Sequence, residues 1–113
     1  MGSEMCIRDR VKEYILEHLD ESALNGEQIS RHFAMSRVQL HRKLKALTDQ
    51  SAGQFVKVVR LEKAFALIQE EELNLSEIAF QTGFNSLSYF SRTFKTAYGK
   101  SPSEILKVKK QTT

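Results

Sequence analysis

Residues 75–105, LSEIAFQTGFNSLSYFSRTFKTAYGKSPSEI, carry the strongest structural signals in the sequence. Phe90 and Phe94 stand four residues apart, which places both on one stripe of a helix that runs from 87 to 98. Ala97 continues this stripe, and Leu87 and Tyr98 lie beside it. The opposite side carries small and basic residues, namely Ser88, Arg92 and Lys95, with Ser91 between the two faces. The stretch therefore predicts a helix that packs through one face and presents a small and basic face outward.

Residues that cap helix ends mark the helix boundaries along the chain. A Ser or Asn followed three residues later by Gln or Glu resembles a capping box, in which the cap oxygen accepts a backbone N–H and the later side chain bonds back. Five such pairs occur: Asn25/Gln28, Ser36/Gln39, Ser51/Gln54, Asn74/Glu77 and Ser101/Glu104. Pro102 follows the last cap at the first helical position, and Gly83 and Gly99 stand where helices should end. Helix starts and stops are therefore frequent, and no long strand-like alternation interrupts them.

The signals predict an all-α fold of seven helices, with two helix-turn-helix subdomains joined by a long linking helix. The expected helices cover 9–21, 26–34, 37–48, 52–71, 75–82, 87–98 and 102–109. The expected domains are 10–50 for the first subdomain, 51–72 for the linking helix and 73–113 for the second subdomain. Residues 1–9 mix charges without an apolar period and are interpreted as a foreign leader.

An internal repeat relates the two predicted subdomains. Ile29 corresponds to Ile78, 49 residues later, and Leu40 corresponds to Phe90, 50 residues later, because Asn85 adds one residue to the second turn. Further matched pairs are Ser36 with Ser86, Arg42 with Arg92, Leu44 with Phe94, and Lys45 with Lys95. Each copy is a short helix, a tight turn and a second helix, which is the helix-turn-helix unit.

The second helix of the first copy shows the same two faces. Leu40, Leu44 and Leu47 form its apolar stripe, while Val38, Arg42 and Lys45 face away and His41 flanks them. One solvated helix face with an Arg and a Lys is ordinary, but two such faces in one repeat register indicate a function. A helix in the DNA major groove needs small residues for close approach, Arg for guanine and Lys for phosphate.

The charge distribution agrees with a polyanionic partner. The net charge of the 113 residues is only +3, but the charges are clustered. The stretch from 36 to 60 contains six Lys or Arg residues and one acid, Asp49. The stretch from 92 to 110 contains six Lys or Arg residues and one acid, Glu104. Basic side chains therefore gather around the two predicted reading helices, as a phosphate footprint requires.

The sequence contains no motif for a disulfide, a metal site, an enzyme active site or a membrane span. The single cysteine, Cys6, excludes an internal disulfide and suits a reducing compartment, so we expect a cytoplasmic protein. His18 and His32 lack the spacing of metal ligands and are interpreted as ordinary helix residues. Phosphate-binding loops, nucleophile–base motifs and apolar runs of membrane-spanning length are not found. We expect no enzymatic activity, no cofactor, no metal and no membrane association.

The chain from about 10 to 109 resembles the DNA-binding domain of the AraC/XylS family of bacterial transcription regulators. Residues 75–105 are similar to the family signature, which expects Ala79, Gly83, Phe84, Phe90, Phe94, Gly99 and Pro102 where they stand. The segment SRVQLHRKLKALTDQS, at 36–51, is similar to output domains attached to hybrid two-component sensors. The resemblance implies seven helices and sequence-specific binding of double-stranded DNA for transcription regulation.

The resemblance also implies which residues contact DNA. Base contacts are expected from Val38, His41, Arg42, Leu87, Ser88, Ser91 and Arg92. Phosphate contacts are expected from Ser36, Arg37, Lys45, Lys57, Ser86 and Lys95. Val38 stands where the family often carries a larger aromatic or polar residue, and it can make only apolar contact, for example with a thymine methyl.

The expected partners follow from the same resemblance. An upstream sensory domain is missing from these 113 residues, so we interpret the chain as the output part of a larger regulator, and RNA polymerase is a further candidate partner. The isolated domain is expected to be a monomer. The alternative is a helical protein-interaction module that has lost DNA binding, although the retained Arg42, Arg92 and both matched lysines argue against it.

Overall fold

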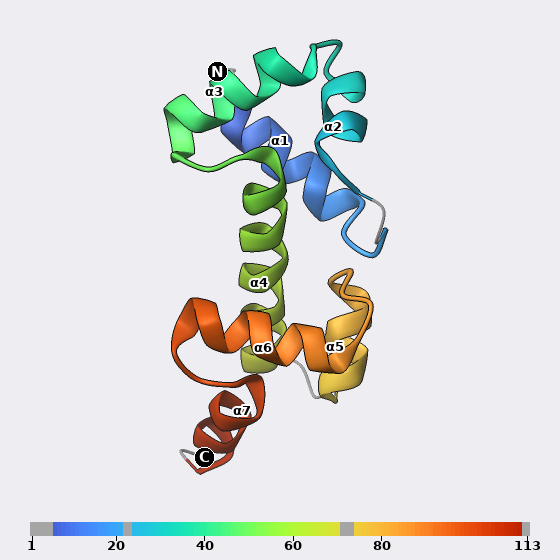
Figure 1. Ribbon diagram of the computed structural model, residues 1–113. Coiled ribbons are helices and arrows are strands. Elements are labelled where there is room, and N and C mark those ends of the chain that lie inside the picture. The colour runs from blue at the N-terminus through green and yellow to red at the C-terminus, as the bar shows by residue number, and fades with distance from the viewer. Residues whose placement is uncertain (1–5, 22–23, 71–73, 112–113) are drawn as a thin grey trace, which may run out of the picture. The chain divides into compact units, whose positions relative to one another are not determined.

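The computed structural model of the chain describes residues 6–21, 24–70 and 74–111, with side chains through Lys107. These residues form seven α-helices and no strand, so the predicted fold class is confirmed (Figure 1). The helices are α1 (Ile7–Glu17), α2 (Gly26–His32), α3 (Arg37–Thr48), α4 (Ala52–Glu70), α5 (Leu75–Gln81), α6 (Leu87–Tyr98) and α7 (Pro102–Gln111). The chain divides into two compact units, Met1–Val59 and Arg60–Thr113, so the division falls within α4. The domain boundaries 10–50, 51–72 and 73–113 stay a prediction.

The first unit is built around α3, which packs on α1 and α2. Its core consists of aliphatic side chains and one phenylalanine: Val11, Ile15, Leu19, Leu24, Ile29, Leu40, Leu44, Phe55, Val56 and Val59. The first two turns of α4 supply the last three of these side chains. Burial of these apolar groups fixes which face of α3 points inward.

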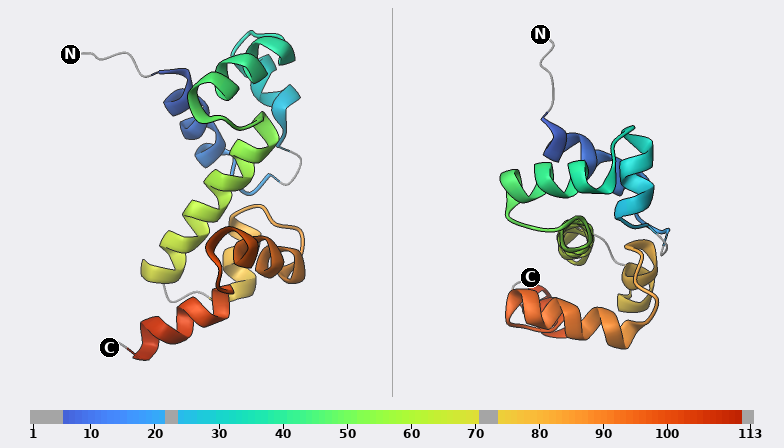
Figure 2. Two further views of the ribbon diagram at one scale, coloured as in Figure 1. Left: turned by 60° about the vertical axis from the view of Figure 1, so that its left-hand side comes forward. Right: turned by 45° about the horizontal axis from the view of Figure 1, so that its top comes forward.

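The second unit repeats this plan with aromatic residues in its core. Helix α6 packs on α5 and α7, and the turn between α5 and α6 is tight (Figure 2). The core comprises Leu61, Ala64, Leu67, Ile68, Ile78, Ala79, Phe84, Phe90 and Phe94. Phe90 lies between Phe84 and Phe94, with ring centroids 5.1 and 5.7 Å away, so the rings form a continuous packed cluster.

All five predicted caps are present. Asn25 and Asn74 each accept a bond from the backbone N–H three residues later, at 3.0 and 2.8 Å. The three serine caps form reciprocal boxes: Ser36 with Gln39, Ser51 with Gln54, and Ser101 with Glu104. In the last box the Ser101 backbone N–H, followed by its hydroxyl, lowers the pKa of the Glu104 carboxyl. Caps of this kind define where each helix begins.

The first helix differs from its predicted range of 9–21. It begins at Ile7, inside the stretch interpreted as a leader, and Ile7 packs against the first core. It ends at Glu17 because the chain turns at His18, whose ring contacts the Glu21 carboxylate at 2.6 Å and lowers the pKa of that carboxyl. The turn buries Leu19. The origin of residues 1–9 stays a prediction.

The apolar stripes of α3 and α6 are shorter than predicted. Leu47 is 48% exposed, and the matched Ala97 is also exposed. The flanking residues Leu87 and Tyr98 are likewise exposed rather than buried. The last turn of each helix contributes no residue to either core. Two buried residues, one turn apart, therefore suffice to hold each helix.

The repeat extends to the backbone conformation at the ends of helices. Left-handed φ values occur at Ala34 (55°) and Asp49 (60°) in the first copy, and at the matched Gly83 (88°) and Gly99 (79°) in the second. Glycine adopts this conformation without steric cost, whereas alanine is strained by roughly 1–2 kcal/mol. Ala34 is therefore a strained position in the first helix-turn-helix.

We predict opposite stability effects for glycine and alanine exchanges. Ala34→Gly should raise the free energy of unfolding by about 0.5–1 kcal/mol, because it removes left-handed strain. Gly99→Ala should lower it by about 1 kcal/mol through strain alone, since no atom lies within 4 Å of the added methyl.

Gly53→Ala serves as the matched control for this pair. Gly53 lies in α4 with open space around it and no positive φ, so alanine should stabilise the helix by about 0.5 kcal/mol. Denaturant titration of the three variants measures the differences. A stabilising Gly99→Ala or a destabilising Ala34→Gly would contradict the repeat of backbone conformation.

Candidate nucleic-acid interface

The outward face of α3 carries the residues predicted to contact DNA in the first unit. Leu40 and Leu44 are almost completely buried, which turns the other side of the helix to solvent. Val38 is 62% exposed. The remaining predicted residues of this helix, Arg37, His41, Arg42 and Lys45, are all exposed. The structure thus brings one apolar, one imidazole and three cationic side chains together on one helix.

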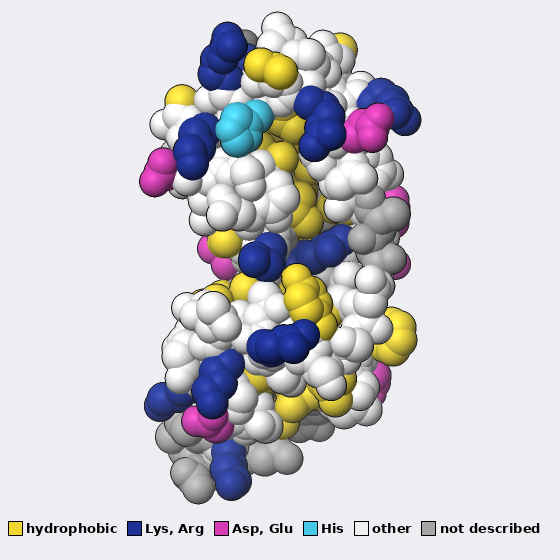
Figure 3. Space-filling view, in the orientation of Figure 1, with side chains coloured by type: hydrophobic (Ala, Val, Ile, Leu, Met, Phe, Trp, Pro, Cys, Tyr) yellow, Lys and Arg dark blue, Asp and Glu magenta, His cyan; other side chains and the backbone are white. Residues whose placement is uncertain are grey.

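The outward face of α6 carries the matched set in the second unit. Phe90 and Phe94 are fully buried and fix the register of the helix. The predicted contact residues Ser88, Arg92 and Lys95 are exposed, Leu87 is 42% exposed and Ser91 is half-buried. In Figure 3, Lys and Arg side chains lie over α3 in the first unit and over α6 in the second.

The predicted phosphate contacts Ser36 and Ser86 are the N-caps of these two helices. Each hydroxyl oxygen accepts a backbone N–H at 3.1 Å, from Gln39 and Tyr89 respectively. Because a hydroxyl accepts and donates at once, each O–H can still donate to an anion. The N-terminus of a helix also favours negative charge.

The predicted lysine contacts remain available to a ligand. Lys45 approaches the Asp49 carboxylate at only 4.0 Å, and both groups are more than half exposed. Such a surface pair contributes about 0–1 kcal/mol and is easily exchanged for a phosphate. Lys57 is exposed on α4. The basic side chains of Lys109 and Lys110 lie outside the described part of the chain.

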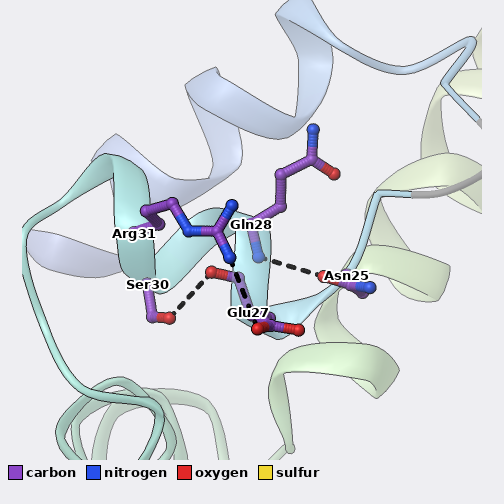
Figure 4. A network of polar contacts seen from close by, with 5 residues as sticks. All are labelled: Asn25, Glu27, Gln28, Ser30 and Arg31. Carbon is purple, nitrogen blue, oxygen red and sulfur yellow. Dashed lines mark hydrogen bonds and ion pairs between the residues drawn. The ribbon is translucent and has the colours of Figure 1, made fainter.

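Within the described part of the chain, Arg31 on α2 forms an ion pair, unlike the two arginines that are predicted to contact bases. Arg31 approaches the Glu27 carboxylate at 3.4 Å, and Ser30 donates to the Glu27 carbonyl at 2.9 Å (Figure 4). The N-cap Asn25 completes this local network by accepting the Gln28 backbone N–H. Arg42 and Arg92 have no ion pair within 4.0 Å among the residues that the structure describes. Their guanidinium groups are therefore more available to a base edge than that of Arg31.

Two residues near the α6 face were not among the predicted contacts. The guanidinium of Arg92 lies 6.0 Å from the ring centroid of Tyr89, and Tyr89 is 45% exposed. Arg60, at the start of the second unit, is half-buried, and this burial lowers the pKa of its guanidinium. The sequence signal for Tyr89 was its position three residues after the Ser86 cap, where the other serine caps have Gln or Glu.

The described part of the chain contains neither a metal-binding cluster nor a membrane-spanning helix. Across the described ranges, His, Cys, Asp and Glu side chains form no group of three or more that could hold a metal ion. None of the helices in the described part of the chain is long and apolar enough to span a membrane.

Comparison with known proteins places the chain in a family. The family described as "Helix-turn-helix domain" matches residues 29–107, which include both α3 and α6. The chain belongs to this AraC-type helix-turn-helix family. The family assignment therefore confirms the predicted resemblance.

Two curated relatives illustrate the contexts in which the family domain occurs. The transcriptional activator RhaS of Mannheimia succiniciproducens is 34% identical over 90 residues, which cover 80% of this chain and 34% of RhaS. Histidine kinase P4 of Formosa agariphila is 35% identical over 75 residues, which cover 66% of this chain and 6% of the kinase. The chain thus spans about a third or less of the length of these relatives.

Two solved structures share the fold. The C-terminal domain of AraT, a response regulator from Geobacillus stearothermophilus, has a TM-score of 0.82 and 32% identity over 95% of this chain and 88% of that chain. The DNA-binding domain of AdpA, a global transcriptional factor solved with a target DNA, has a TM-score of 0.81 and 25% identity over 92% of this chain and 93% of that chain.

We predict that the two arginines contribute to base discrimination and the lysines do not. Arg42→Ala and Arg92→Ala should each weaken binding to the preferred DNA by roughly 1–3 kcal/mol and relax one base position. Lys57→Ala and Lys95→Ala should weaken binding to all sequences about equally, because phosphates carry no sequence information. Titrations against a preferred site and its single-base variants, at fixed salt, measure both effects.

Arg31→Ala is the control matched in charge. It removes only an exposed ion pair on α2 and should leave base preference unchanged. An Arg92→Ala variant with wild-type affinity and preference would show that α6 does not read DNA.

Proposed function

We propose that this chain is the sequence-specific, double-stranded DNA-binding part of a bacterial transcription regulator. The observation that carries the proposal is the repeated outward face: Arg42 and Arg92, and Lys45 and Lys95, occupy equivalent exposed positions on α3 and α6. A structural role alone requires only the buried stripe of each helix. Family membership and the AdpA domain solved with its target DNA support the same function.

The proposed contacts fall into two classes, those to bases and those to phosphates. Arg42 and Arg92 donate two bonds to guanine O6 and N7, His41, Ser88 and Ser91 bond to base edges, and Val38 and Leu87 pack on thymine methyl groups. Ser36, Arg37, Lys45, Lys57, Ser86 and Lys95 contact phosphates and fix the register of the helices on the duplex. The chain is therefore proposed to recognise bases through seven side chains and to gain further affinity from six phosphate contacts, four of which are made by Lys or Arg.

The tandem repeat has a consequence for the DNA site. Because both readers belong to one chain, no two-fold axis needs to relate them, and the proposed site is asymmetric rather than palindromic. The 19 residues of α4, at about 1.5 Å each, correspond to roughly 28 Å, which is close to one turn of B-DNA. We therefore propose that the two readers enter successive major grooves.

Insertions between the two recognition elements test this arrangement. A five-base-pair insertion, about half a turn, should reduce affinity toward that of a half-site, because the second element then faces the opposite side of the duplex. An insertion of the same length outside the two elements is the control and should leave affinity unchanged. Wild-type affinity with the internal half-turn insertion would mean that only one helix reads DNA.

The likeness to a histidine kinase and to a response regulator supports a further part of the proposal. We propose that a sensory or phosphoacceptor domain precedes this domain in a larger regulator, as in a hybrid two-component sensor. RNA polymerase is the proposed partner if the regulator is an activator, as the RhaS relative is named. The domain is proposed to act in the cytoplasm as a binding module without its own enzymatic activity, and the isolated domain to be a monomer.

The alternative function is a protein-interaction module that has lost DNA binding. A gel-shift titration against genomic fragments at low and fixed salt separates the two functions. DNA binding that weakens steeply as salt rises is the expected result, because phosphate contacts release counterions. Failure to bind any fragment at low salt would favour the interaction module.

A further inference from the structure

Helix α6 begins differently from the other helices that have a serine cap. In α3, α4 and α7 the residue three positions after the serine is Gln or Glu, and its side chain accepts the serine backbone N–H at 3.0, 3.0 and 3.3 Å. In α6 this position is Tyr89. Tyr89 donates its backbone N–H to Ser86 at 3.1 Å, but in the described part of the chain no side chain bonds back to the Ser86 N–H. Helix α6 therefore lacks half of the cap that its counterpart α3 has.

The Tyr89 ring is instead packed against a core residue. Its centroid lies 5.9 Å from that of Phe84, which is only 4% exposed. Phe84 in turn contacts the fully buried Phe90, with centroids 5.1 Å apart. Tyr89 itself remains 45% exposed, so part of the ring is available above the core. The ring is therefore a partly exposed aromatic surface that packs against the core through Phe84.

The guanidinium of Arg92 lies over the Tyr89 ring. Arg92 follows Tyr89 by three residues, the spacing at which helical side chains meet, and its guanidinium carbon lies 6.0 Å from the ring centroid. That separation is within the range of a cation–π contact. Among the described residues, Arg92 has no ion pair that would compete with this contact.

The first copy of the repeat provides the comparison. The residue that matches Tyr89 is Gln39, whose side chain closes the Ser36 capping box. The two contacts between a cation and a ring in the described part of the chain involve Arg10 and Arg92, so Arg42 has no such ring beside it. At this position the second copy thus has a ring beside its arginine, whereas the first copy has a side chain that completes the capping box.

We infer that Tyr89 is a positioning residue that holds Arg92 for base recognition by α6. The inference rests on the proposed DNA reading and deepens it. A planar guanidinium that rests on a ring loses less conformational freedom when it forms two bonds to guanine, and the ring leaves its donors free at the edge. Tyr89 thereby increases discrimination at the base pair that Arg92 reads, without contacting that base pair itself.

Two substitutions separate this role from a role in folding. Tyr89→Gln removes the ring but creates the serine and glutamine pair that caps α3 and α4, so the melting temperature should not fall. Tyr89→Phe keeps the ring and removes only the hydroxyl. The Arg92→Ala variant first identifies the base position at which preference is relaxed. The measured quantity is then the affinity for DNA with guanine at that position, divided by the affinity for DNA with another base there.

Tyr89→Gln should reduce this ratio by about two- to fivefold, as the loss of an exposed cation–π contact predicts. Tyr89→Phe should keep the wild-type ratio, and Tyr89→Gln should have no further effect in the Arg92→Ala background. A wild-type ratio for Tyr89→Gln, or an equal loss for Tyr89→Phe, would overturn the inference.

The failure of this inference is distinguishable from failure of the proposed function. If Arg92→Ala relaxes preference and Tyr89→Gln does not, DNA reading stands and the role of Tyr89 is wrong. If Arg92→Ala itself leaves preference unchanged, α6 does not read DNA, and the inference falls with the proposed function.

Discussion

The burial of two side chains one turn apart on the second helix of each copy determines the rest of the structure. Leu40 and Leu44 are buried on α3, and Phe90 and Phe94 on α6. Each pair fixes the rotation of its helix, because turning the helix would expose two large apolar groups at a cost of roughly 1.5–3 kcal/mol each. Once the rotation is fixed, the side of the helix opposite the buried pair must face solvent, and this side carries Arg42 and Lys45 on α3 and Arg92 and Lys95 on α6. The arginine and lysine of each outward face are therefore oriented by the core.

Much of the fold could be predicted from the sequence because local signals agree with the periodicity. The caps at Ser36, Ser51 and Ser101 place three helix starts through hydrogen bonds between residues three apart, which are visible in the sequence alone. The repeat added independent evidence, since the same register appears twice. The outward positions of Arg42 and Arg92 could be predicted for the same reason.

Features that depend on contacts beyond the local sequence could not be predicted. The end of α1 at Glu17 depends on the turn that buries Leu19, and periodicity alone continued the helix to 21. The exposure of Leu47 follows from the limited extent of the core, not from its position on the stripe. The packing of Tyr89 between Phe84 and Arg92 requires the turn that brings Phe84 back onto α6. Domain boundaries and base contacts stay predictions.

Methylation interference on a bound DNA fragment tests the central claim most directly, namely that the outward faces of α3 and α6 enter the major groove. Methylation at guanine N7 modifies the major groove, whereas methylation at adenine N3 modifies the minor groove. If both helices enter the major groove, two groups of guanines should block binding when methylated at N7, and adenine N3 methylation within those groups should have little effect. Interference confined to adenine N3, or none at guanine N7, would contradict this claim.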